Sequence, residues 1–155
     1  MRTGPVRVTV EVMDRETDSR LEGRLVAAAW VFAVASGVHL VDHLRRGQGS
    51  VSDELYYLGN VSTIVQVAAI TLVLAHHRLA PIAAVAAGFP LALGFAAAHW
   101  LPEWSAASDP VWEIDSWTWF SYIASAAEIA GAIALGLAGL ALIRRQGLAS
   151  FATAR

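Results

Sequence analysis

Side chains that can bind a metal ion or carry a proton interrupt otherwise apolar stretches of this chain. His39 and His43 lie four residues apart, so on a helix both imidazoles project from one face, about 6 Å apart along the axis. Two imidazoles at this spacing can bind one transition-metal ion, with Asp42 as a third ligand or as a neighbour that fixes a tautomer. His99 ends another stretch and could complete the set. The HExxH pattern of zinc peptidases is absent, because Leu40 follows His39.

Glu128 is the acidic residue that lies deepest in an apolar stretch. It follows Trp117 by eleven residues, which corresponds to about 16 Å along a helix and to the middle of a bilayer. An ionised carboxylate there costs about 2.5 kcal/mol or more, so we predict that it is protonated, paired or hydrated. The predicted partner is His39, with Gln66 as a hydrogen-bond donor. Glu128 is therefore the candidate catalytic residue, as a proton carrier, and a purely structural role is the alternative.

A helix end at the lipid headgroups is an alternative explanation for part of this pattern. Asp42 and His43 stand next to Arg45 and Arg46, and charged side chains of this kind often end a membrane helix at the interface. His39 lies one turn deeper and is not explained in this way.

The composition is that of a membrane protein. The chain has 155 residues, of which 56% are hydrophobic and 15% charged, and its mean hydropathy is +0.51. Four segments reach the roughly 17 to 25 residues that a helix needs to cross a bilayer. We predict an all-α, integral membrane four-helix bundle over residues 25–143, between a polar segment (1–24) and a tail (144–155). The predicted spans are 25–44, 58–75, 79–101 and 117–143.

Arginine placement predicts the orientation of the bundle. All the basic residues other than histidine are arginine; nine lie before the first span, between the second and third, or after the fourth, and only two lie on the opposite side. By the positive-inside rule, both termini are predicted to be cytoplasmic, which gives a multi-pass protein of the inner (plasma) membrane. The arginine-only composition suggests a bacterial source, and nothing in it favours binding to nucleic acid.

The start of the chain alternates valine with polar residues over residues 6–12, which predicts a β-strand. Such a strand has no partner in this sequence, so it would pair with another chain. Alternatively, translation begins at Met13 and residues 1–12 are not part of the protein. Residues 14–24 are charged and are expected to form a short surface helix or to remain disordered.

Polar residues gather in one half of the predicted bundle, which favours a pocket open to the outer face. The 101–116 connection would form its mouth, and its aromatic residues could contact an apolar or lipid-like ligand, although interfacial anchoring is the favoured explanation for them. In the second span, Asn60, Thr63 and Gln66 are expected to hydrogen-bond to neighbouring helices. Five tryptophans lie at this end: Trp100, Trp104, Trp112, Trp117 and Trp119.

Three functions remain open from the sequence. The first is a metal centre of His39, His43 and His99, with Asp42 or Glu128, for zinc, copper or iron; the absence of cysteine excludes thiolate ligands. The second is a haem protein with His39 and His99 as axial ligands. The third is a non-catalytic assembly or ligand-binding subunit, which could form homo-oligomers. Small residues support the haem and assembly hypotheses by allowing close approach: Ala29, Ala33, Gly37, Gly94, Ala132 and Gly136.

Overall fold

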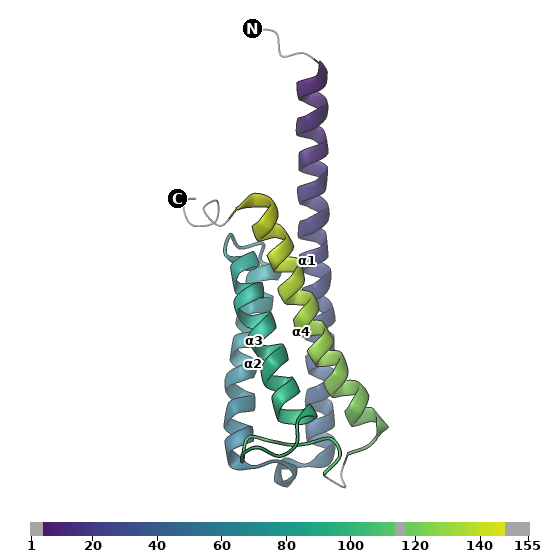
Figure 1. The fold of residues 1–155 in the computed structure, drawn as a ribbon, viewed down its shortest axis with the longest axis vertical. Coiled ribbons are helices and arrows are strands. Elements are labelled where there is room, and N and C mark those ends of the chain that lie inside the picture. The colour runs from purple at the N-terminus through teal and green to yellow at the C-terminus, as the bar shows by residue number, and fades with distance from the viewer. Residues whose placement is uncertain (1–4, 114–116, 148–155) are drawn as a thin grey trace.

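The computed structural model describes residues 5–113 and 117–147 and shows a bundle of four long helices (Figure 1). Each helix is long and apolar enough to cross a membrane, and the described residues contain no β-strand. The predicted all-α membrane fold is confirmed. The helices are α1 (Pro5–Arg46), α2 (Asp53–Leu74), α3 (Ala80–Trp100) and α4 (Trp119–Gln146), and a short 3₁₀ turn, η1 (Gln48–Ser50), connects α1 to α2.

The strand predicted for residues 6–12 is wrong, because these residues belong to α1. A lone strand leaves its backbone N–H and C=O groups without partners, whereas a helix pairs them internally. Extending a helix that already exists also avoids the cost of starting a new one. Helix α1 therefore continues well beyond the bundle at its N-terminal end (Figure 1). Near the start of this extension, Arg145 of α4 forms ion pairs with Asp14 and Asp18 of α1.

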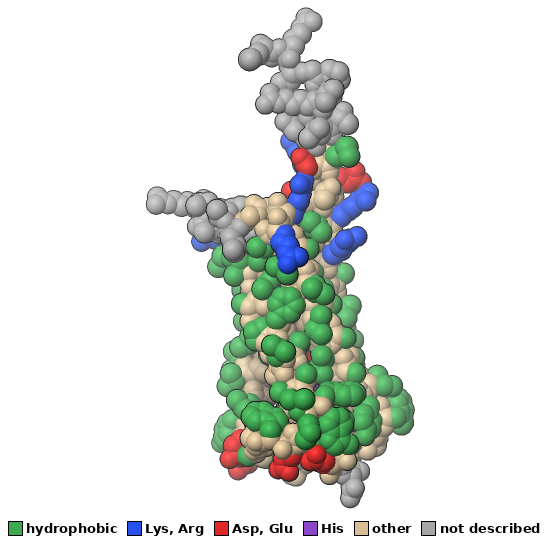
Figure 2. Space-filling view, in the orientation of Figure 1, with side chains coloured by type: hydrophobic (Ala, Val, Ile, Leu, Met, Phe, Trp, Pro, Cys, Tyr) green, Lys and Arg blue, Asp and Glu red, His purple; other side chains and the backbone are tan. Residues whose placement is uncertain are grey.

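The two ends of the bundle differ in charge. We call the end with the 47–52 and 101–118 connections the loop end, and the end where α4 finishes the terminal end. Figure 2 shows arginine side chains with acidic ones among them at the terminal end, acidic side chains at the loop end, and an apolar surface between them. This separation is what the arginine pattern of the sequence predicts.

Glycines set the contact between α3 and α4. A Cβ atom on Gly88 would lie 2.6 Å from the backbone oxygen of Ala132 and 2.6 Å from the backbone nitrogen of Gly136, so the two backbones touch at this point. Gly131 packs in the same way against Phe32 of α1. Ala132 and Gly136 are thus packing residues, as predicted. Gly37 of α1 is exposed and does not pack against another helix.

Helix α2 contributes little to the core. Its buried residues are Leu55, Gln66, Ala69 and Val73. Asn60 donates to the backbone oxygen of Tyr56 (2.9 Å), and the hydroxyl of Thr63 donates to that of Gly59 (2.9 Å), so both bond to their own helix. The predicted bonds to neighbouring helices are therefore wrong for Asn60 and Thr63 and hold for Gln66 alone.

The close approach at Gly88 gives a test of the packing. Gly88→Ala places a methyl group against the α4 backbone and is expected to destabilise the bundle by about 1 to 3 kcal/mol, the usual cost of overpacking. Gly94→Ala on the same helix is the control, because its Cβ meets nothing within 4 Å and alanine favours helix formation. Thermal unfolding of the detergent-solubilised variants measures the difference. Equal midpoints for the two variants would contradict this packing.

Candidate metal centre

Three histidines from two helices converge inside the loop end. His39 stacks on His43 with 4.6 Å between ring centroids, and His99 of α3 lies 4.9 Å from His39 and 5.9 Å from His43. One nitrogen from each ring can be chosen so that all three lie within 4.8 Å of one another. Nitrogens that share one ion at about 2.0 to 2.1 Å lie roughly 3.5 to 4 Å apart, so closure by about 1 Å would bring them onto one ion. His39, His43 and His99 therefore form the group that the sequence predicted.

The 101–118 connection accounts for the matching depth of His39 and His99. Helix α1 continues for seven residues, about 10 Å, beyond His39, whereas α3 ends one residue after His99. The connection fills the space above α3: the amide of Asp109 donates to the oxygen of Ala98 (2.8 Å), and that of Val111 donates to the oxygen of His99 (2.9 Å). A residue at the end of α3 is in this way buried inside the protein.

Glu128 has the two partners that the sequence predicted. One carboxylate oxygen contacts Nδ1 of His39, and the other accepts a hydrogen bond from Nε2 of Gln66 (3.3 Å). His39, Gln66 and Glu128 are 3%, 6% and 4% exposed, so the group is shielded from solvent. These three residues connect α1, α2 and α4 at one level of the bundle.

The second nitrogen of His39 is unsatisfied. Nε2 of His39 is buried without a hydrogen-bond partner among the described residues, and it would carry the lone pair of a neutral ring that donates from Nδ1 to the Glu128 carboxylate. An imidazole that donates from one nitrogen to a carboxylate and offers the other is the common arrangement of a metal-ligating histidine. The geometry of His39 therefore fits a metal ligand.

His99 and His43 differ in the partner of Nδ1, which is an acceptor for His99 and a donor for His43. Nδ1 of His99 lies 3.2 Å from the backbone oxygen of Asp109, an acceptor, so its proton is on Nδ1 and Nε2 is free to bind an ion. Nδ1 of His43 instead lies 3.1 Å from Nη2 of Arg46, which only donates, so the His43 proton is on Nε2. His39 and His99 are set as ligands, and His43 becomes one only if its ring or Arg46 moves.

Asp42 is not among the converging ligand atoms. Its Oδ1 accepts from Nη2 of Arg45 (2.8 Å) and from the hydroxyl of Ser121 (2.9 Å), and its Oδ2 lies 3.3 Å from Nε of Arg46. Oδ2 is buried without a hydrogen-bond partner among the described residues, and Asp42 lies outside the converging histidine group, so its role as a ligand stays a prediction. Its carboxylate compensates the arginines at the end of α1.

A buried ion pair covers the histidines and was missed in the sequence. The Arg46 side chain is fully buried and bonds to both oxygens of Asp109, at 3.2 and 2.7 Å. Its guanidinium carbon lies 4.8 Å from the ring centroid of Trp117, which in turn contacts His99. No sequence feature indicated this pair, because Arg46 and Asp109 resembled ordinary interfacial charges.

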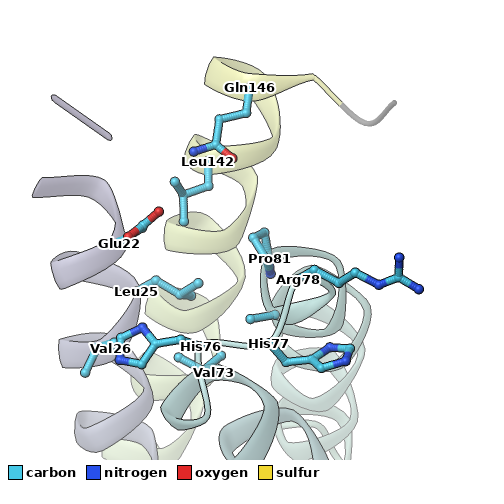
Figure 3. Close-up of a pocket in the computed structure, with 11 residues that line it drawn as sticks. Glu22, Leu25, Val26, Val73, His76, His77, Arg78, Pro81, Leu142 and Gln146 are labelled. Carbon is cyan, nitrogen blue, oxygen red and sulfur yellow. The ribbon is translucent and has the colours of Figure 1, made fainter. Parts of the chain in front are cut away.

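The predicted polar pocket is a buried cluster at the loop end, with partial exposure at His43. Trp117 is buried above it, whereas Trp104, Trp112 and Trp119 are exposed as interfacial aromatic residues are. A cavity of about 230 Å³ lies at the terminal end. Figure 3 shows Leu25, Val26, Val73 and Leu142 around it, with Glu22 and Gln146 toward its rim.

The arrangement does not fit a haem held between His39 and His99. Two imidazoles on opposite sides of one metal have ring centroids roughly 6 Å apart, given bonds of about 2 Å, and a flat macrocycle must fit between them. The centroids here are 4.9 Å apart. Gly37 and Gly94, which were expected to make room for the macrocycle, are both exposed and have open space at their Cβ positions.

Comparison of the chain with protein-family models, curated proteins and solved structures gave no match. The fold and the buried residues define the class as a small four-helix membrane protein with a histidine cluster.

The ion pair above the cluster predicts a non-additive stability effect. Arg46→Met leaves Asp109 buried without its cation and is expected to cost about 3 to 5 kcal/mol. Arg46→Met with Asp109→Leu removes both charges, while Arg45 still pairs with Asp42, so the double variant should be more stable than Arg46→Met alone. Unfolding midpoints in detergent measure this, with exposed Arg15→Met as a control. If the unfolding midpoint of the double variant falls by the sum of the losses for Arg46→Met and Asp109→Leu alone, the pairing is refuted.

Proposed function

We propose that this protein binds one transition-metal ion in the membrane through His39, His43 and His99. Glu128 acts as the positioning residue that holds His39, and Arg46, Asp109 and Trp117 close the site. Imidazole ligands suit zinc, copper and iron rather than magnesium or calcium, which take oxygen ligands. A proton-carrying role for Glu128 in a reaction at this ion stays a prediction.

The buried Nε2 atom of His39 carries the proposal. A buried polar atom without a partner costs about 1 to 3 kcal/mol, so a histidine with a purely structural role is expected to have both nitrogens satisfied. His39 has one nitrogen fixed by a carboxylate and the other unbonded, in a group with two further imidazoles. An ion at this position removes that cost.

The charge separation of the bundle supports an orientation with the metal centre toward the outer face. Arginines gather at the terminal end, where acidic residues lie among them, and the side chains visible at the loop end include acidic ones and no arginine (Figure 2). Under the positive-inside rule, we propose that both termini are cytoplasmic and that the loop end faces the outside of a bacterial plasma membrane. An ion would then reach the site from outside, past the partly exposed His43.

Metal content tests the binding proposal. Protein purified in detergent and supplied with zinc, copper or iron should retain about one ion per chain, whereas His39→Ala and His99→Ala should retain none. His76→Ala and His77→Ala are matched controls, because these histidines lie in the exposed turn at the terminal end. Elemental analysis together with circular dichroism separates loss of the ion from loss of the fold. If the natural sequence retains no ion, or if His39→Ala retains as much, the histidines are structural and the assembly alternative holds.

Labelling of engineered cysteines tests the orientation, since the natural chain has no cysteine. Ala106 is exposed in the 101–118 connection, so Ala106→Cys should react with a membrane-impermeant maleimide on intact cells. Ser19→Cys is exposed at the terminal end and should react only after the cells are opened. The reverse pattern would place the site on the cytoplasmic side.

A further inference from the structure

The cavity at the terminal end lies apart from the histidine cluster and has an apolar interior. Its volume is about 230 Å³, and residues of all four helices line it. Leu25, Val73 and Leu142 form its walls and are 4%, 1% and 2% exposed. Apolar cavities are poorly hydrated, and one of about 150 Å³ holds benzene. The space here therefore accommodates an apolar body somewhat larger than one aromatic ring.

One charged side chain faces this cavity. Figure 3 shows the carboxylate of Glu22 directed from α1 toward the cavity, whereas the guanidinium of Arg78 points away from it. Within the described part of the chain, Glu22 forms no ion pair. Three acidic residues nearer the start of α1 are paired with arginines: Asp14, Glu16 and Asp18. The charge presented to the cavity is therefore negative, although the terminal end as a whole is rich in arginine.

Two further polar side chains border the cavity. The carboxamide of Gln146, the last residue of α4, is directed toward it (Figure 3) and bonds to no other described side chain. His76 follows α2 with a φ of 49°, in the left-handed region where glycine is usual. Its ring reaches toward Val26 of α1 and closes that side of the cavity (Figure 3). Glu22, Gln146 and His76 thus give an apolar cavity a polar border that can accept hydrogen bonds.

We propose that this cavity binds a small amphiphilic amine. The apolar body lies among Leu25, Val73 and Leu142, and the protonated amine lies at the rim beside Glu22. An ammonium group has only donors and a positive charge, so it matches a carboxylate with an amide oxygen nearby. An anionic amphiphile with the same body would place its charge against Glu22. This site is separate from the proposed metal centre and does not depend on it.

Three probes with one apolar body test the proposal. The full-length protein in detergent is titrated by equilibrium dialysis with 4-phenylbutylamine, 4-phenylbutanol and 4-phenylbutyrate. We expect one amine per chain, with the alcohol bound about tenfold more weakly and the carboxylate more weakly still. Leu142→Trp fills the cavity and should abolish this binding, which separates it from uptake by the detergent. Equal affinities for the amine and the carboxylate, or amine binding that Leu142→Trp does not change, would overturn the proposal.

A charge variant tests the role of Glu22. Glu22→Gln keeps the shape of the side chain and should reduce amine affinity about tenfold while leaving alcohol affinity unchanged. Glu16→Gln is the matched control, because Glu16 makes the same charge change on α1 outside the cavity and pairs with exposed Arg20. Circular dichroism checks that both variants are folded. Equal amine affinities in the two variants would contradict recognition by Glu22.

A lipid probe separates a small amine from a membrane lipid that carries the same group. Dihexanoyl phosphatidylethanolamine has a primary amine, but its phosphate and two chains exceed a body of this size. We expect it to bind more weakly than 4-phenylbutylamine. If it binds more tightly and Leu142→Trp abolishes that binding, the cavity is a lipid site and the proposal is wrong.

Discussion

The contact between Glu128 and His39 is the interaction on which the rest of the loop end depends. A carboxylate midway along an apolar helix needs a partner, and the residues that supply one come from two other helices: His39 of α1 and Gln66 of α2. The lipid-facing apolar surface does not specify how four helices should be rotated, because apolar side chains gain nothing by leaving lipid for one another. This polar contact does, since it fixes which faces of α1, α2 and α4 point inward.

Packing and polarity are divided between the two halves of the bundle. Toward the terminal end, glycines such as Gly88 and Gly139 allow the backbones of α3 and α4 to come into contact. Toward the loop end, the helices enclose polar groups, and the 101–118 connection covers them with Asp109 and Trp117. The backbone contact of α3 with α4 thus lies in one half of the bundle, and the buried polar cluster lies in the other.

The features of this protein that could be predicted from the sequence depend on the length of an apolar segment and on the depth of a residue within it. The four spans follow from apolar length, and the pairing of Glu128 with His39 follows because both lie below the same surface. Contacts between an irregular connection and a helix end could not be predicted in this way. No periodicity relates Asp109, in an irregular connection, to Arg46 at a helix end, so their ion pair could not be predicted. The helical form of residues 6–12 was missed for a different reason, since alternating valines favour a strand only when another strand is available to pair with them.

X-ray absorption at the metal edge of the loaded protein tests the central claim most directly, because it reports the atoms that surround the ion. If His39 and His99 bind it, with His43 as the third ligand, the first shell contains two or three nitrogens at about 2 Å, with the outer-shell scattering of imidazole rings. The His76→Ala protein should give the same spectrum. A first shell of oxygen alone, or a spectrum that is unchanged in His39→Ala, would contradict the account.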